Sequence, residues 1–328
     1  MAVSLLVVVV GTALLFDFTN GFHDSANAIA TSISTRALRP GIALGMAAVA
    51  NVVGALISTE VAATLGKGIV DAQAVNQLVV LAALIGAVVW NFVTWYFGIP
   101  SSSSHALIGG LIGAVLAAAG SGRVKWTGIV DKVLIPTVTS PVIGLFVGAL
   151  LAIGLYWTFR GMRPHVASSR FRTAQTVSAA LMAFSHGSND AQKTMGVISL
   201  ALLAAGKITH FHVPLWVKLA SAITIGLGTF SGGKRIIRTL GMKLVKLQPI
   251  DGFAAETAAS AVLLTTAHLG FPVSTTHVIT SSIMGVGATK RLSAVRWGVT
   301  FNILVAWLLT LPMAAAIAAL AYKIATMF

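Results

Sequence analysis

Residues Phe18–Thr31 read FTNGFHDSANAIAT, and the chain around this stretch is almost entirely apolar. The stretch holds one acidic residue, Asp24, with polar residues on both sides of it. An ionisable side chain inside a lipid bilayer costs roughly 2.5–3.5 kcal/mol on insertion scales, so it usually marks a transport pathway or a binding site. How the stretch is interpreted therefore depends on whether the surrounding chain crosses a membrane.

The composition is that of a polytopic membrane protein. Of the 328 residues, 56% are hydrophobic and 9% are charged, and the mean hydropathy is +0.90. Long apolar runs such as Val133–Trp157 match the roughly 30 Å hydrocarbon core of a bilayer. The first run has no basic lead, so we interpret it as a retained helix and not as a signal peptide. We expect an all-α protein in the plasma (inner) membrane, with the lipid bilayer as a partner.

Charge and cysteine content exclude several classes of function. The net charge of +14 comes from short basic blocks between the apolar runs. Basic loops on the cytoplasmic side of a membrane explain this pattern, so nucleic-acid binding is not expected. The chain contains no cysteine, which excludes disulfides and thiolate metal sites.

The chain contains the same pattern twice. NGFHDSAN resembles HGSNDAQK, and Asp190 follows Asp24 by 166 residues. GIPSSSSHALI resembles GFPVSTTHVIT, and Pro272 follows Pro100 by 172 residues. Landmarks in the same order at nearly constant spacing indicate a tandem duplication. We expect two membrane repeats, residues 1–165 and 166–328.

The two repeats are expected to have inverted topologies. An odd number of apolar segments in the first repeat makes the second enter the membrane from the opposite side. The most basic blocks then share the cytoplasmic side, and both termini are extracytoplasmic. The segments of the first repeat are residues 2–33, 41–59, 76–97, 105–119 and 133–159. The basic blocks are Arg36/Arg39, Arg160–Arg172, Lys234–Lys246 and Lys290–Arg296.

Charge counting leaves one alternative open. The segments within residues 76–119, and their counterparts within residues 253–289, form either pairs of full crossings or re-entrant hairpins. Both arrangements preserve the parity of the crossings, so loop charges do not separate them.

Asp24 and Asp190 lie in the middle of long apolar spans, at equivalent places in the two repeats. Gly21 and Gly187 lie close to them, and glycine tolerates unwound backbone. Unwound backbone inside a membrane has to line an enclosed cavity, where half-helix ends coordinate ions and substrates. We therefore expect two broken helices that line one shared substrate and ion site.

The second repeated pattern favours an anion. In both repeats a Gly-x-Pro turn is followed by consecutive hydroxyl residues that open a helix. One hydroxyl is enough to cap a helix, and the others, with free N–H groups and the positive helix end, suit an oxyanion. The candidate anion-binding residues are Ser102, Ser103, Ser104, Ser274, Thr275 and Thr276.

An oxyanion beside two carboxylates requires compensating positive charge. Protons, sodium ions or a metal ion are mobile sources of that charge, and Lys193 is a fixed one. Glu256, in the apolar run after Gly252, is a further candidate ion ligand. His105 and His277 are expected to form bracing hydrogen bonds, because no His/Asp cluster has the spacing of a metal site.

These motifs closely resemble those of the PiT family of inorganic phosphate transporters, in its bacterial low-affinity branch. GFHDSANAIAT and HGSNDAQKTMG are similar to the two copies of the family signature, and GIPSSSSH and GFPVSTTH to its two hairpin tips. The resemblance implies an inverted-repeat fold with two re-entrant hairpins and phosphate import by cation symport, without enzymatic activity. The expected substrate-binding set adds Asn27, Asn189, Gln192 and Lys193 to the tip hydroxyls, and the expected ion-coupling set is Asp24, Asp190, Asn20 and Glu256.

One departure from the family pattern concerns the coupling ion. The usual second signature has Asn where this chain has Lys193, and NDAQK is similar to the variant in proton-driven bacterial members. The resemblance therefore favours protons over sodium, with a neutral divalent metal–phosphate complex as an alternative form of the substrate. No cofactor is expected apart from the coupling cation, and a homodimer is expected.

Two other functions stay open on the sequence. A carrier of sulfate or of another oxyanion would use the same hydroxyl-rich helix ends. An intramembrane hydrolase has less support, because the sequence contains neither a Gly-x-Ser-x-Gly elbow nor an HExxH zinc motif.

Overall fold

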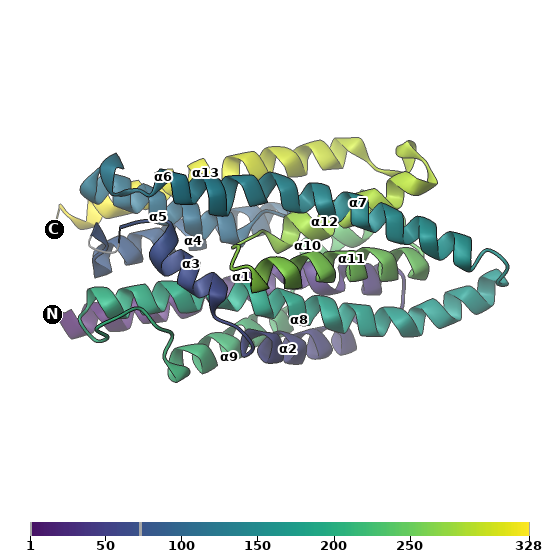
Figure 1. The fold of residues 1–328 in the computed structure, drawn as a ribbon, viewed down its shortest axis with the longest axis horizontal. Helices are drawn as coiled ribbons and strands as arrows, with labels where there is room; N and C mark the ends of the chain where they lie inside the picture. Colours follow the sequence, from purple (N-terminus) through teal and green to yellow (C-terminus); the bar gives the residue numbers. More distant parts are fainter. Residues whose placement is uncertain (1, 72–73, 328) are drawn as a thin grey trace.

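The computed structural model describes residues 2–71 and 74–327. Its helices run along one long axis, and both chain ends lie at the same end of the bundle (Figure 1). Within the described residues the β pairing is limited to an isolated bridge between Val70 and Val124. The α-helices are α1 (Ala2–Ser34), α2 (Pro40–Ala55), α3 (Glu60–Gly68), α4 (Gln77–Phe97), α5 (Ser103–Ala119), α6 (Trp126–Ile129), α7 (Ile135–Thr158), α8 (Pro164–Ala204), α9 (Leu215–Ser231), α10 (Lys234–Arg238), α11 (Pro249–His268), α12 (Thr275–Lys290) and α13 (Trp297–Ala325).

The order of helices repeats itself with inverted topology, as the sequence predicts. α1 corresponds to α8, the α4–α5 pair to the α11–α12 pair, and α7 to α13. The α2–α3 pair and the segment formed by α9 and Lys234–Leu244 are both bent, by 65° and 60°. These two bends are the broken helices of the fold. The division of the chain at residue 165 stays a prediction.

The described helices are long enough for a multi-pass membrane protein. Four of them are apolar enough to cross a bilayer: α1, α4, the segment Trp126–Thr158 and α13. Each bent pair is long enough to make one further crossing. α8 has 41 residues, which is about 60 Å of helix, and it runs along the whole bundle (Figure 1).

The α4–α5 and α11–α12 pairs are re-entrant hairpins. They enter the bundle from opposite ends, and their tips meet in the middle (Figure 1). Ser104 Oγ in the first tip donates to the carbonyl oxygen of Val273 in the second tip, at 3.3 Å. Gly98 and Gly270, with φ of 66° and 71°, adopt the left-handed conformation that lets each hairpin turn sharply. The structure thereby decides between the two arrangements that charge counting left open.

Each hairpin packs against the long helix of the other repeat, α5 on α13 and α12 on α7. Small residues allow these helices to approach closely. A Cβ atom on Gly113 of α5 would lie 2.1 Å from the backbone oxygen of Ala315 in α13. On Gly285 of α12 it would lie 2.0 Å from the backbone oxygen of Leu145 in α7. The two repeats are therefore interlocked through their hairpins.

The connections α1–α2, α7–α8 and α12–α13 lie at the end of the bundle opposite the termini (Figure 1). Three of the four basic blocks lie in or beside these connections. This grouping agrees with the predicted topology, in which basic blocks share one side and the termini share the other. The cytoplasmic location of the basic end stays a prediction.

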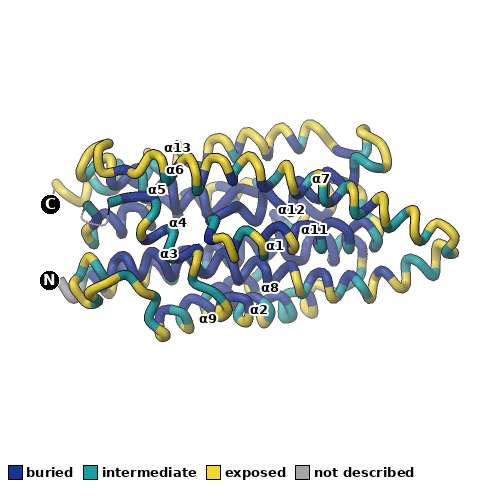
Figure 2. The backbone as a smooth tube through the Cα atoms, in the orientation of Figure 1, coloured by how far each residue is buried: buried dark blue, intermediate teal, exposed yellow. Residues whose placement is uncertain are grey.

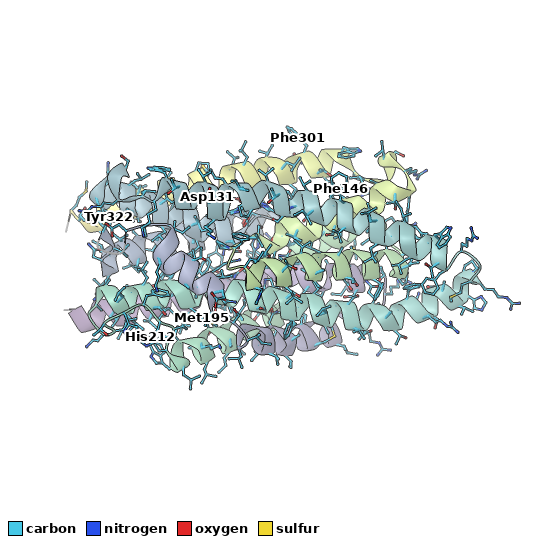
Figure 3. The ribbon with its side chains drawn as sticks, in the orientation of Figure 1. Asp131, Phe146, Met195, His212, Phe301 and Tyr322 are labelled. Carbon is cyan, nitrogen blue, oxygen red and sulfur yellow. The ribbon has the colours of Figure 1, made fainter. Side chains whose placement is uncertain are left out.

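Two buried apolar clusters lie on either side of a polar layer. On α1 the cluster toward the termini ends at Phe16, and the other cluster begins at Ala26. Figure 2 shows the buried backbone in the interior and the exposed residues on the outer helices. Phe146 and Phe301 are 59% and 65% exposed and point outward from α7 and α13 (Figure 3). Exposed apolar side chains of this kind suit a lipid-facing surface.

The hairpin packing predicts that Gly113→Val lowers the thermal stability of the protein in detergent. The new side chain would collide with backbone of α13, which cannot move aside as a flexible side chain could. Gly154→Val in α7 is the matched control, because a Cβ there meets no atom within 4 Å. Equal melting temperatures for the two variants would contradict the close α5–α13 contact.

Candidate functional site

Five polar residues of α1 lie on one face of the helix. Their spacing of three or four residues places them on one side of an α-helix, and each is at most 2% exposed. The residues of this polar face are Asp17, Asn20, Asp24, Asn27 and Thr31. α8 packs along α1 and brings the second signature, with Asp190, to the same depth.

The breaks expected in these two helices are absent, because α1 and α8 run without interruption through Gly21 and Gly187. The glycines serve close packing instead. A Cβ atom on Gly21 would lie 2.4 Å from the backbone oxygen of Ile225, and one on Gly187 would lie 2.2 Å from that of Asn51. The expectation of unwound backbone at these positions is wrong, since the missing side chains make room for neighbouring helices.

Ser102 and Ser274 act as N-caps of α5 and α12. Ser102 Oγ accepts a hydrogen bond from the backbone N–H of His105 at 3.1 Å, and Ser274 Oγ accepts one from that of His277 at 3.3 Å. Their hydroxyls are thus used within the helix starts. The hydroxyl residues of the first turns are Ser103, Ser104, Thr275 and Thr276.

The two aspartates meet at the second hairpin tip. Thr275 Oγ1 donates to Asp190 Oδ2 at 3.3 Å and lies 3.5 Å from Asp24 Oδ2. Thr276 Oγ1 lies 3.4 Å from Asp24 Oδ1. Asn27 Nδ2 donates to Thr276 at 2.9 Å and to Thr275 at 3.3 Å. These two threonines therefore connect the signatures of both repeats.

Asp24, Asp190, Thr275 and Thr276 form what we call the centre. Lys193 is buried beside them, with 1% of its surface exposed. Its ammonium forms an ion pair with Asp190 and donates to the hydroxyl of Ser104. It also donates to the carbonyl oxygen of Val273, at 3.1 Å. All three contacts hold the charge inside the protein, so Lys193 does not extend toward the membrane surface. The ion pair compensates both charges at a depth where either alone would be costly.

Two histidines lie beside the aspartates. His23 Nδ1 lies 2.6 Å from Asp24 Oδ1, and its Nε2 lies 3.1 Å from Thr94 Oγ1 of α4. His186 Nε2 lies 3.2 Å from Asp190 Oδ2 and 3.9 Å from Asp24 Oδ2. His23 thus ties the centre to the first hairpin, and His186 lies between the two carboxylates.

Asn51 determines which nitrogen of His186 carries a hydrogen. Thr229 Oγ1 donates to the carbonyl oxygen of Ile225, so it accepts from Asn51 Nδ2, at 3.0 Å. The Asn51 amide oxygen then faces His186 Nδ1 at 2.7 Å and accepts a hydrogen bond from it. His186 Nε2, which faces the carboxylates, is consequently the nitrogen that can bind a proton or a metal ion.

The expected bracing role of the other two histidines holds for one of them. His105 Nε2 lies 2.8 Å from Thr137 Oγ1 of α7 and forms a hydrogen bond with it. His277 instead stacks on Trp307, with ring centroids 3.8 Å apart. Neither ring nitrogen of His277 has a hydrogen-bond partner within the described part of the chain. For His277 the expected hydrogen bond is replaced by aromatic packing.

Asp24, His186 and Asp190 form a set of metal-ligating side chains whose ligand atoms all lie within 4.8 Å of one another. Sequence spacing did not reveal this set, because its members come from two helices of different repeats. Asn51, which orients His186, could not be recognised for the same reason.

Several predicted site residues make no hydrogen bond to the central aspartates, threonines or lysine. Gln192 Oε1 accepts from the backbone N–H of Val61 at 2.9 Å, so Gln192 faces α3 and does not join the centre. Asn20, Asn189 and Ser103 are buried, and their side-chain polar atoms have no partner among residues 2–71 and 74–327. These three residues therefore retain unused hydrogen-bonding capacity.

Glu256 belongs to a second polar cluster, between the centre and the basic end. Its carboxylate accepts hydrogen bonds from Thr31 and Ser178, and from Gln175 Nε2 at 3.1 Å. Asp17, on the other side of the centre, was not singled out from the sequence. Its Oδ1 accepts from Thr194 Oγ1 at 2.9 Å.

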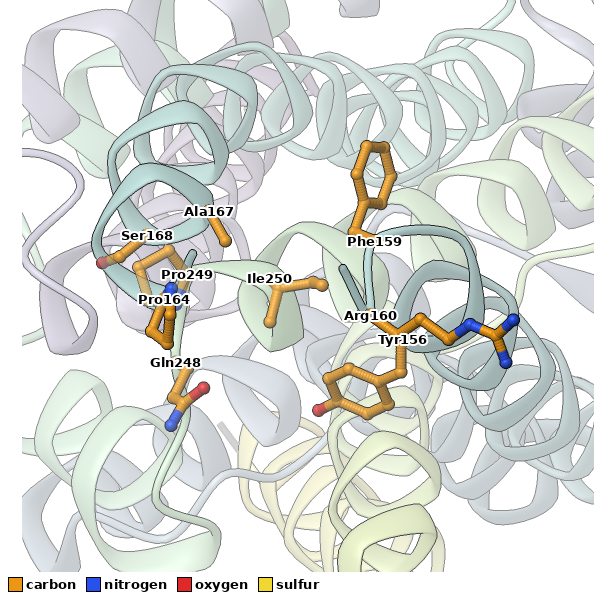
Figure 4. Close-up of a pocket in the computed structure, with 9 residues that line it drawn as sticks. All are labelled: Tyr156, Phe159, Arg160, Pro164, Ala167, Ser168, Gln248, Pro249 and Ile250. Atoms are coloured by element: carbon orange, nitrogen blue, oxygen red, sulfur yellow. The ribbon is translucent and has the colours of Figure 1, made fainter. Parts of the chain in front are cut away.

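A surface pocket of about 380 Å³ lies away from this centre, beside the α7–α8 connection and the start of α11 (Figure 4). Tyr156 on its wall donates to Asp251, which also pairs with Lys290. The pocket is lined by Tyr156, Phe159, Arg160, Pro164, Ala167, Ser168, Gln248, Pro249 and Ile250. None of these residues belongs to the central cluster, in which Asp24 and Asp190 are at most 2% exposed.

Comparison with known proteins agrees with this geometry. A "Probable low-affinity inorganic phosphate transporter" of Mycobacterium tuberculosis is 50% identical over 320 residues, covering 97% of this chain and 77% of that protein. A protein of the same name from Rhizobium meliloti is 50% identical over 324 residues, covering 98% of this chain and 97% of that protein. A solved structure described as "The sodium-dependent phosphate transporter" has a TM-score of 0.86 at 25% identity, covering 99% of this chain and 100% of that one.

The sequence profile of the phosphate transporter family matches residues 20–318. This range includes both signatures, both hairpin tips and nearly all of the membrane helices. The protein therefore belongs to the phosphate transporter family.

Proposed function

We propose that this chain is a secondary active transporter that imports inorganic phosphate by cation symport, with protons favoured over sodium. The observation that carries the proposal is the buried Lys193 ammonium, which pairs with Asp190 and contacts Ser104 at the first hairpin tip. A fixed ammonium beside hydroxyl groups at a helix start is suited to binding phosphate.

Phosphate binds, in this proposal, at the first turns of α5 and α12. The positive N-terminal ends of these helices favour an anion there. Ser103 and Asn189 support the proposal, because both are buried and have hydrogen-bonding groups without partners among the described residues. The names of the relatives favour phosphate over sulfate. The proposed phosphate ligands are Asn27, Ser103, Ser104, Asn189, Lys193, Thr275 and Thr276.

The charge balance supports proton coupling. Asp24, Asp190 and a phosphate anion together bring at least three negative charges, and two unit charges 4 Å apart interact by about 4 kcal/mol at an effective dielectric constant of 20. Lys193 supplies one fixed positive charge, so fewer mobile cations have to accompany each phosphate. The remaining cation can then be a proton. Sodium coupling is the alternative, because the solved relative is described as sodium-dependent.

A divalent metal ion that travels with phosphate is an alternative form of the substrate. Asp24, His186 and Asp190 offer two carboxylates and one imidazole, a donor set that suits first-row divalent metals. Asn51 orients His186 toward the carboxylates. In this form the metal ion takes the place of a coupling cation, and the complex with phosphate is neutral.

We assign cation coupling to Asp24, Asp190, Asn20 and Glu256. Glu256 is fully buried, and the hydrogen bonds that its carboxylate accepts from described residues come from hydroxyl and amide groups. Glu256 lies between the centre and the basic end, where a cation would pass as it leaves the centre for the cytoplasm. In the proposed orientation that end is cytoplasmic and the termini are extracytoplasmic, and the protein is a homodimer.

Hydrolase activity has less support than transport. Two contacts at the centre resemble a base–nucleophile pair, Lys193 with Ser104 and His23 Nε2 with Ser101 Oγ at 3.5 Å. Ser101 Oγ donates its hydrogen to Thr94 Oγ1, at 2.9 Å, and not to His23. Lys193 is engaged by Asp190 as an ammonium, and an ammonium has no lone pair with which to accept a proton. The chain is therefore proposed to act without enzymatic chemistry.

Phosphate uptake into proteoliposomes, with pH and sodium gradients imposed separately, tests the proposed coupling. The wild-type protein should accumulate phosphate along a pH gradient with sodium absent. Lys193→Asn removes the fixed charge and should impair this uptake, and added sodium should partly restore it. Lys323→Asn, at an exposed position, is the control and should behave as wild type. Strict sodium dependence of the wild-type protein would refute proton coupling.

The hairpin tip provides a second prediction, measured by calorimetry. Thr275→Ala and Thr276→Ala each remove one hydroxyl from the proposed phosphate site. A hydrogen bond to a charged group is worth about 1.5–3 kcal/mol, so the Kd for phosphate should rise at least about tenfold. Thr139→Ala, on the exposed face of α7, should leave the Kd unchanged. An unchanged Kd in both tip variants would place the anion elsewhere.

A further inference from the structure

Asp17 is a buried acid that the proposed phosphate site does not use. It lies seven residues before Asp24 on the same face of α1, which is about 10 Å closer to the end with the termini. Its exposure is 0%. Oδ1 accepts one hydrogen bond, from Thr194 Oγ1 at 2.9 Å, and Oδ2 has no partner among the residues that the structure describes.

Among the described residues, no hydrogen bond joins Asp17 to the next turns toward the termini. On α1 they present Ala13 and Val9, and on α8 they present Ile198 and Ala201, all of which are fully buried. These residues belong to one apolar cluster. Asp17 is therefore separated from the water at that end by an apolar layer, and from the centre by Asn20.

The charged groups that act on Asp17 are His186, Asp190 and Lys193, all on α8. Asp190 and Lys193 pair with each other, so they leave little net charge to compensate a second carboxylate. On α1 itself the nearest charged pair is His23 with Asp24.

Among the described residues, the contacts that α4 and α9 make with this part of α1 come from uncharged side chains and backbone. α4 contributes Asn91, which donates to Thr19 Oγ1 at 3.4 Å. α9 contributes the segment around Ile225 and Thr229, which packs on Gly21. Apart from His186 and the paired Lys193, compensation for an ionised Asp17 would therefore come from a bound cation.

A proton fits this position better than a metal ion does. Hard metal cations such as Mg²⁺ and Ca²⁺ take six or more oxygen ligands, whereas the described residues give Asp17 one hydrogen-bonding hydroxyl, that of Thr194. An ionised carboxylate can accept about four hydrogen bonds, and leaving it with one inside a membrane protein is costly. A neutral carboxylic acid carries no charge to compensate and requires fewer hydrogen bonds than the carboxylate.

We propose that Asp17 is a proton-binding residue that takes up the coupling proton from the end of the bundle that holds the termini. When that end is open, the carboxylate gains a proton from water, and when it closes, the neutral acid is sealed inside. Glu256 contacts α1 through Thr31, seven residues after Asp24, so the two acids flank the centre at similar distances. The inference rests on the proposed proton symport.

The test compares two activities of purified protein in proteoliposomes. One is accumulation of phosphate driven by a pH gradient, and the other is exchange of phosphate across the membrane at equal pH. Asp17→Asn cannot release a proton, so accumulation should fall to background while exchange persists. Asp17→Glu keeps a titratable group and should restore accumulation. Asp131→Asn removes an exposed carboxylate and should leave both activities unchanged.

Each outcome separates this inference from the function on which it rests. A wild-type protein that does not respond to a pH gradient refutes proton symport itself. If wild type responds and Asp17→Asn accumulates phosphate equally well, the role of Asp17 alone is refuted. Loss of exchange in a folded Asp17→Asn protein would also refute it, because Asp17 would then belong to the phosphate site.

Thr194→Val provides a second test that leaves the carboxyl group in place. The hydroxyl of Thr194 stabilises the ionised form of Asp17 more than the neutral form, because hydrogen bonds to charged groups are stronger. Without it, proton release requires a higher pH, so the pH midpoint of uptake should move upward by about half a unit to one unit. An unchanged midpoint would overturn the assignment even if Asp17→Asn does not fold.

Discussion

A charged lysine in the interior of a membrane protein is the constraint on which this structure depends. The Lys193 ammonium and the Asp190 carboxylate would each be costly alone at this depth, so each requires the other. The remaining contacts of Lys193 come from the two hairpin tips, through Ser104 and Val273. Both tips therefore have to reach the middle of the bundle, and re-entrant hairpins are the arrangement that brings them there.

The two repeats around this centre differ in their acidic residues. At the spacing of 166 residues Asp17 corresponds to Ala183, and at the spacing of 172 residues Glu256 corresponds to Leu84. Asp17 and Glu256 thus lack an acidic counterpart in the other repeat, and the two lie on opposite sides of the central aspartates. Inverted repeats explain how two similar half-sites face each other. Asp17 and Glu256, which have no counterpart, make the two sides of the centre chemically different.

The sequence predicted the membrane class, the duplication, its inversion and the meeting of Asp24 with Asp190, because apolar length, repeated motifs and buried charge are local signals. It could not decide between crossings and hairpins, since both have the same parity. It misplaced the helix breaks at Gly21 and Gly187, because glycine serves unwinding and close packing equally well. Contacts such as Asn51 with His186 join residues far apart in the chain, so no spacing pattern reveals them.

The location of the anion tests the central claim most directly. Arsenate has the shape and charge of phosphate, and arsenic gives an anomalous X-ray signal that identifies its position in a crystal. With the anion bound through the Lys193 ammonium, the arsenic peak should lie about 4 Å from Lys193 Nζ, between the N-termini of α5 and α12. A peak in the pocket beside Arg160, with none near Lys193, would contradict a phosphate site built around the buried ion pair.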